Sequence, residues 1–169
     1  MPISLSGRRP PRRWRPLATC LLALLSACSG GNTGGSAAAP LADGTFARIQ
    51  RTIIEPSCAG CHRSGSSDAR QSGLVLSADS SYQQMVSAPS LHPKARADGL
   101  LRIKPFRADS SLLYHKLAWI PGHHSADYGN LMPMGTTQGL SMGQLEYVRR
   151  WIEAGAPRTG HVVDTAVLR

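Results

Sequence analysis

Cys58-Ala59-Gly60-Cys61-His62 is the stretch on which the interpretation of this 169-residue sequence depends. Two cysteines separated by two residues present their thiols one turn of chain apart, and an imidazole follows at once. This spacing is the attachment signature of a c-type haem. The two thiols reach the two vinyl groups on one edge of the porphyrin, and the imidazole then lies under the iron. We therefore expect one covalent haem c held by Cys58, Cys61 and His62.

Two other kinds of site can use the same cysteine pair. A redox dithiol normally occurs in a thioredoxin-like βαβ setting, whereas the neighbouring sequence predicts helices and loops. A zinc site needs further ligands, usually a second Cys/His pair at close spacing, and the close pair His123-His124 lacks that spacing. The histidines that could add a zinc ligand are His92, His115, His123, His124 and His161.

A haem iron needs a ligand on its other face. Methionine is favoured because a neutral, soft thioether stabilises ferrous iron and raises the reduction potential. Met132-Pro133-Met134-Gly135 offers two candidates in a Pro/Gly-rich loop, whereas Met85 and Met142 stand at helical positions and are expected to fill the core or the surface. A histidine ligand gives a lower potential and stays open as an alternative, with His115, His123 and His124 as candidates.

The second ring nitrogen of His62 also needs a partner. Histidines that bind a metal usually donate this N–H to a carbonyl or carboxylate, which fixes the ring and raises its basicity. We expect a backbone carbonyl within residues 72–76 to accept it, given the distance of this stretch from the motif.

Helical periodicity surrounds the motif and predicts an all-α domain. Residues 43–56 carry apolar side chains at Phe46, Ile49 and Ile53, with Asp43 or Thr45 as N-cap and Pro56 closing the helical segment. Residues 142–154 follow a capping box of Ser141 and Gln144 and precede Gly155, which suits a left-handed C-terminal position. The apolar side of this last helix is Leu145, Val148, Trp151 and Ile152, and Trp151 is expected in the core.

The middle of the chain gives weaker signals. Residues 111–119 predict a third helix with Leu112, Leu113 and Leu117 on its apolar side and Asp109 or Ser110 as its cap. Residues 80–87 predict a short helix carrying Tyr82 and Val86. Residues 63–73 and 121–139 read as loops, and Pro89, Pro93 and Gly99 interrupt the stretch between.

The N-terminus predicts an export signal over residues 1–27. Five of the 19 Lys and Arg residues and none of the 10 acids lie there, which leaves a formal charge of +4 for the rest. The following apolar run, residues 17–25, is too short to span a bilayer. Leu25-Ser26-Ala27-Cys28 resembles the lipobox of bacterial lipoproteins, which implies cleavage before Cys28 and its lipidation. A plain secretory signal is the alternative.

Residues 28–42 are rich in Gly, Ser and Ala and predict a flexible tether, followed by a domain over residues 43–157 and a C-terminal tail over 158–169. The basic residues of the mature chain are scattered, so the sequence gives no indication of nucleic-acid binding.

The order of motifs between residues 46 and 157 resembles the planctomycete-type cytochrome c domain, a relative of class I cytochromes c. The matching stretches are the apolar helix, Cys58 to His62, Gly73-Leu74-Val75-Leu76, Pro105, Ser110-Ser111-Leu112-Leu113, Met132-Pro133, Leu140-Ser141, Gln144 and Trp151-Ile152-Glu153-Ala154-Gly155-Ala156. The resemblance implies a class I-like helical fold around one haem, with the first and last helices crossing beside it. It also implies Met132 as the sixth ligand.

The chain departs from that family pattern twice. Pro105-Phe106 replaces the usual Pro-Gly, and Met132-Pro133-Met134 replaces the usual Met-Pro-Pro, so Met134 stays open as the alternative ligand.

The sequence thus predicts an exported electron carrier, or the haem subunit of a redox complex, anchored by Cys28 on the periplasmic side of a bacterial membrane, with redox proteins of the cell envelope as partners. Of the two membranes of such a bacterium, we expect the outer one. A haem-based sensor lacking a firm sixth ligand is an alternative, as is a non-haem lipoprotein using Cys58 and Cys61 for zinc or a disulfide.

Overall fold

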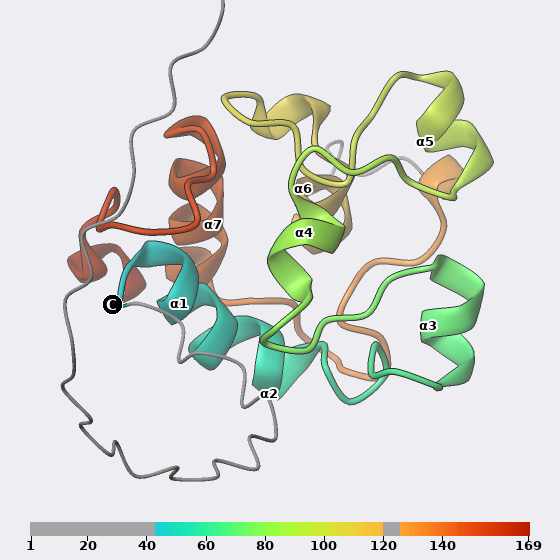
Figure 1. Ribbon diagram of the computed structural model, residues 1–169, viewed down its shortest axis with the longest axis horizontal. Helices are drawn as coiled ribbons and strands as arrows, with labels where there is room; N and C mark the ends of the chain where they lie inside the picture. Colours follow the sequence, from blue (N-terminus) through green and yellow to red (C-terminus); the bar gives the residue numbers. More distant parts are fainter. Residues whose placement is uncertain (1–42, 120–125) are drawn as a thin grey trace, which may run out of the picture. The chain divides into compact units, whose positions relative to one another are not determined.

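Helices and loops make up residues 43–119 and 126–169, the ranges that the computed structural model describes (Figure 1). Within these ranges there is no β-strand, only four isolated bridges, so the all-α prediction is confirmed for them. The predicted signal, Cys28 and the tether lie outside the described residues, as do His123 and His124. None of the helices in the described ranges is long and apolar enough to cross a membrane.

The first helical segment leads directly into the cysteine motif. It consists of α1 (Thr45–Ile49), a wider π-helical stretch η1 (Gln50–Ile54) and the short α2 (Glu55–Ser57). The predicted apolar face is confirmed, since Phe46, Ile49 and Ile53 are all buried. The predicted caps are wrong: Gly44 is the N-cap residue and no side chain caps the helix. The Thr45 hydroxyl is engaged elsewhere, because it accepts the backbone N–H groups of residues 162 and 163.

The last helix, α7 (Met142–Glu153), agrees with its prediction at both ends. Ser141 and Gln144 form the reciprocal capping box, and Gly155 takes a left-handed φ of 94° after the helix. All four predicted apolar positions are buried, as is Tyr147. On the outer face, Glu146 forms ion pairs with Arg149 and Arg150, and the hydrogen bond from Arg149 is the main reason that the pKa of Glu146 falls to about 2.

Two further helices lie near their predicted positions. These are α4 (Ser81–Met85) and α6 (Leu112–Leu117). Leu112 and Leu117 are buried as predicted, while Leu113 is half-buried. The predicted cap at Asp109 or Ser110 is wrong, because residues Ala108–Ser110 form a separate 3-10 turn, η2, and Ser111 becomes the N-cap residue of α6.

Two short helices occur where the sequence predicted loop or a break. Helix α3 (Ser67–Ser72) lies within residues 63–73 because the Ser66 hydroxyl accepts the Ala69 N–H and Gly73 closes the helix with a φ of 60°. Helix α5 (Pro93–Ala97) begins at a proline, which suits the first turn of a helix, where its missing N–H is not needed. Two 3-10 turns complete the list, η3 (Ala126–Tyr128) and η4 (Thr165–Leu168).

The core forms where the first and last helices pack together. The rings of Phe46 and Trp151 stack with centroids 5.5 Å apart, and Tyr82 of α4 meets Phe46 edge-on at 5.1 Å. Trp151 is fully buried, and its indole N–H donates to the carbonyl of Pro157 at 3.0 Å. Its prediction as a core residue is therefore confirmed.

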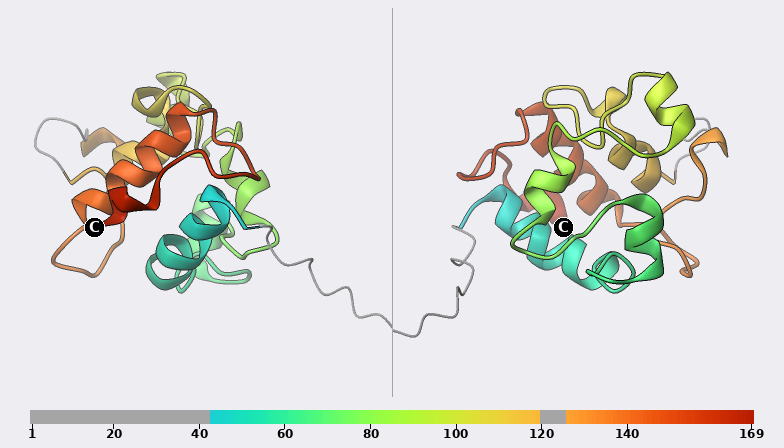
Figure 2. Two further views of the ribbon diagram at one scale, coloured as in Figure 1. Left: turned by 90° about the vertical axis from the view of Figure 1, so that its left-hand side faces the viewer. Right: turned by 45° about the vertical axis from the view of Figure 1, so that its right-hand side comes forward.

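The C-terminal tail folds back over both of these helices. From the end of α7 it passes to the start of α1, where the Thr45 N–H donates to the Gly160 carbonyl at 2.9 Å. It then returns to α7, against which η4 packs (Figure 2). A Cβ on Gly143 would lie 2.5 Å from the Val167 oxygen, so the two segments are in close contact. Residues 158–169 thus complete the core, a role that the sequence did not reveal.

Candidate functional site

The cysteine motif forms one tight turn at the end of α2. The amide N–H groups of Cys61 and His62 both donate to the Cys58 carbonyl, at 3.2 and 3.0 Å. Cys58 is half-buried and packs against the core cluster, whereas Cys61 is exposed. The two sulfur atoms are not bridged to each other, and the turn presents one at the edge of the core and the other at the surface.

The structure supplies a partner for the His62 ring within the stretch predicted for it. The Nδ1 atom of His62 lies 3.3 Å from the Leu74 carbonyl oxygen and 3.3 Å from the Ser72 hydroxyl. A carbonyl oxygen only accepts, so Nδ1 donates in the contact with Leu74. The proton is then on Nδ1, and the lone pair of Nε2 is left for a metal. A backbone hydrogen bond also holds the stretch around Leu74 beside His62, because the Leu76 N–H donates to the His62 carbonyl at 2.8 Å.

The Cys58 thiol is poorly suited to thiol–disulfide exchange. Burial, with a smaller contribution from the neighbouring charge of Cys61, raises its pKa to about 11. Reactive cysteines have lowered pKa values, because the thiolate is the nucleophile. Cys58 is therefore unsuited to be the attacking thiolate of a redox dithiol.

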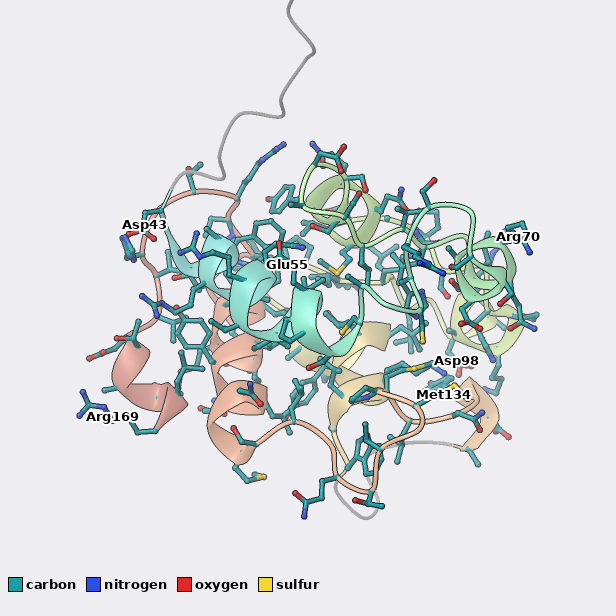
Figure 3. All side chains as sticks on the ribbon, turned by 90° about the horizontal axis from the view of Figure 1, so that it is seen from below. Asp43, Glu55, Arg70, Asp98, Met134 and Arg169 are labelled. Atoms are coloured by element: carbon teal, nitrogen blue, oxygen red, sulfur yellow. The ribbon has the colours of Figure 1, made fainter. Side chains whose placement is uncertain are left out.

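The two candidate methionines differ in their surroundings. Met132 is half-buried and packs against the same core cluster as Cys58, and its backbone is fixed by hydrogen bonds with Lys116 and with the indole of Trp119. Met134, labelled in Figure 3, is 57% exposed. The chain thus offers an inward-packed thioether at residue 132 and a surface thioether at residue 134. Met85 lies in the core and Met142 at the surface, as predicted.

The described histidines that the sequence offered as further ligands lie in different surroundings. The Nδ1 atom of His92 is buried and has no hydrogen-bond partner among the described residues. The Nε2 atom of His115 is hydrogen-bonded to the Asp109 carbonyl at 2.8 Å, and the ring packs against Tyr128. His161 lies at the surface, 3.9 Å from Asp43. Across residues 43–119 and 126–169, no three His, Cys, Asp or Glu side chains are grouped so that they could hold a metal ion.

Sequence reasoning missed two residues that hold the Leu74 backbone in place, Gln84 and Arg102. The Gln84 side chain accepts the Val75 N–H at 2.7 Å, and the Arg102 guanidinium donates to the carbonyls of Ser72 and Gly73. Neither carries a local signal, because a contact with a loop carbonyl leaves no spacing pattern in the sequence.

Comparison of the chain with protein-family models, with curated proteins and with solved structures found no match.

Proposed function

We propose that this chain is an exported monohaem c-type cytochrome that transfers electrons, with its haem bound to Cys58 and Cys61 and its iron held by His62 and Met132. The observation that carries the proposal is the geometry of the C-x-x-C-H turn. Its imidazole is hydrogen-bonded through Nδ1 to the Leu74 carbonyl, which leaves Nε2 for iron.

The residues fit such a haem in their donor chemistry. Two thiols three residues apart on a tight turn suit thioether attachment, and a neutral imidazole with a fixed tautomer suits axial ligation. The half-buried Met132 supplies a soft thioether from a loop packed on the same core cluster as Cys58. Half-buried apolar side chains of that cluster, among them Leu74, Leu113 and Leu140, would provide an apolar wall.

Bound haem would supply the one-electron change between ferrous and ferric iron. The chain's part is then to orient and to exclude water. His62 is oriented by Leu74, and Met132 by the hydrogen bonds on either side of its own backbone. Apolar burial and a neutral thioether both favour the ferrous state, so we expect a high reduction potential.

The class I-like wrapping of the helices around the haem belongs to the same proposal, as do the lipid anchor at Cys28 and the envelope redox partners. The packing of α1 against α7 supports the wrapping, since these are the two helices expected beside the haem. Acyl chains at Cys28 would hold the domain on a membrane surface, because each buried CH₂ contributes about 0.8 kcal/mol.

The test is haem staining of a denaturing gel after expression in cells that mature c-type cytochromes. The full-length chain should keep its stain, since thioethers survive denaturation, and replacing both Cys58 and Cys61 by alanine should abolish it. Cys28→Ser is the matched control: it should keep the haem and move the protein from the membrane to the soluble fraction. A colourless wild-type protein whose two thiols are free or bridged to each other would overturn the proposal.

A further inference from the structure

The Leu74 carbonyl orients the His62 ring together with the Ser72 hydroxyl, and the backbone of Leu74 lies in an exposed to half-buried stretch that needs support. Residues 73–75 belong to no helix. Gly73, immediately before Leu74, has a left-handed φ of 60°. A loop of this kind holds a carbonyl in one direction only when neighbouring groups fix it.

Arg102 fixes the residues before Leu74. Its Nη2 donates to the carbonyls of Ser72 and Gly73, at 3.1 and 2.9 Å, and its Nη1 donates to the Gln84 carbonyl at 2.9 Å. The planar guanidinium thus joins three carbonyls from two segments, which a lysine ammonium on a flexible stem does not reproduce. Arg102 has no carboxylate partner in these contacts, so its charge is directed at the loop itself.

Gln84 fixes the residue after Leu74. Its side-chain oxygen accepts the Val75 N–H at 2.7 Å, and its own carbonyl is one of the three that Arg102 binds. Leu74 is therefore held from both sides by two side chains that are themselves linked.

A buried pair secures the end of the same stretch. Gln50 is fully buried, donates to the Leu76 carbonyl at 3.4 Å, and accepts from the Ser81 hydroxyl at 2.6 Å. Buried polar groups that satisfy one another in this way rigidify the segment they bind. The fixed end of the loop is thus anchored to η1 and α4, and Arg102 and Gln84 complete its support.

We propose that Arg102 and Gln84 are positioning residues that hold the Leu74 carbonyl against Nδ1 of His62 and thereby lower the reduction potential of the bound haem. The inference rests on the proposed function. A strong hydrogen bond from Nδ1 raises the basicity of Nε2, and a more basic ligand stabilises the ferric state. Loosening the loop weakens that bond and raises the potential.

The positive charge of Arg102 acts in the opposite direction, because a nearby cation disfavours the ferric state. The two roles therefore differ in sign. Arg102→Lys keeps the positive charge but loses the planar guanidinium that joins the three carbonyls, so it isolates the positioning role. Gln84→Met loosens the same loop with no change of charge.

The experiment is equilibrium redox titration of the purified, haem-loaded protein. For Arg102→Lys and Gln84→Met we expect the ratio of reduced to oxidised protein at a fixed potential to rise about threefold. At 59 mV per tenfold change for one electron, this is a rise of roughly 28 mV in the reduction potential. The Nδ1 proton of His62, followed by NMR of the ferrous protein, should exchange several-fold faster with solvent in both variants. Arg96→Lys on α5, an exposed arginine outside this network, is the control and should change neither reading.

Each outcome has one meaning. If the potential and the proton exchange of both variants equal those of the wild type, or if the potential falls, the inference is wrong while the proposed function stands. If the wild-type protein carries no covalent haem, the proposed function fails and the inference fails with it. Should Arg102→Lys not fold, Gln84→Met gives the same answer, since it removes one polar contact at a half-buried position.

Discussion

Phe106 stands in a backbone conformation that favours glycine. Its φ is 68°, in the left-handed region, and its ring is 68% exposed. The backbone is held there, because the Phe106 N–H donates to the Ile152 carbonyl at the end of α7, at 2.8 Å. Replacing Phe106 by glycine or by alanine keeps this hydrogen bond and removes the ring in both cases, so the pair differs only in backbone conformational freedom.

The expected difference follows from two terms. A non-glycine residue in the left-handed region costs about 1–2 kcal/mol, which Phe106→Gly relieves and Phe106→Ala keeps. Glycine costs about 0.4–1 kcal/mol through the greater freedom of the unfolded chain. We expect Phe106→Gly to be more stable than Phe106→Ala by about 1 kcal/mol.

Urea unfolding followed by circular dichroism measures this difference. With a slope of about 2 kcal/mol per molar urea for a domain of this size, the midpoint of Phe106→Gly should lie about 0.5 M above that of Phe106→Ala. The ring lies over Gly155, within 2.7 Å of where a Cβ would be, so both variants lose its packing equally. Equal midpoints, or a higher midpoint for alanine, would refute the strain assigned to this position.

Three further outcomes are expected. Met132→Ala should abolish the near-red methionine-to-iron absorption band of the oxidised protein, whereas Met134→Ala should keep it; the reverse would make the exposed methionine the ligand. The pKa of Glu146 is about 2 in the folded chain, below its ordinary value of 4.5, so this carboxylate contributes stability that is present above pH 4.5 and lost as the pH falls toward 2. Glu146→Gln should therefore reduce the drop in unfolding free energy between pH 6 and pH 3 by about 1 kcal/mol, a figure reduced for solvent screening; an unchanged drop would show that the ion pairs contribute nothing. Thr45→Val should cost about 1–2 kcal/mol in urea unfolding because it leaves two backbone N–H groups without their acceptor, while Thr52→Val, at an exposed hydroxyl on the same helical segment, should cost less than half as much.

The parts of the fold that the sequence predicted are those with a periodic apolar face. Phe46, Ile49 and Ile53 repeat at helical spacing because one face of their helix is buried, and α7 shows the same pattern with a capping box in front. Such signals are local, and they predicted where these helices lie. Helices α3 and α5 have only five or six residues and one buried side chain each, too few to form a pattern.

The candidate site also has one part that could be predicted from the sequence and one part that could not. The motif turn was readable because each of its residues has a chemical role at a fixed spacing, and a carbonyl near Leu74 was expected because a ligand histidine needs an acceptor. The residues that hold that carbonyl in place, Gln84 and Arg102, could not be predicted from the sequence. Arg102 is 29 residues from Gly73, and their contact depends on how the chain returns after α5. Phe106 is an intermediate case: the resemblance led us to expect glycine at this position, and the positive φ of Phe106 is a conformation that favours glycine.

The tail's hydrogen bonds to Thr45 have a consequence for the order in which the molecule is assembled. Thr45 and Val162 are 117 residues apart in the chain, so the N-terminal end of the first helix is completed only when the last residues are available. If the chain is exported as proposed and leaves the translocation channel with its N-terminus first, it presents Cys58 and Cys61 before the segment that closes the domain has appeared. Enzymes that attach a prosthetic group would meet an open chain, and closure of the tail would follow their work.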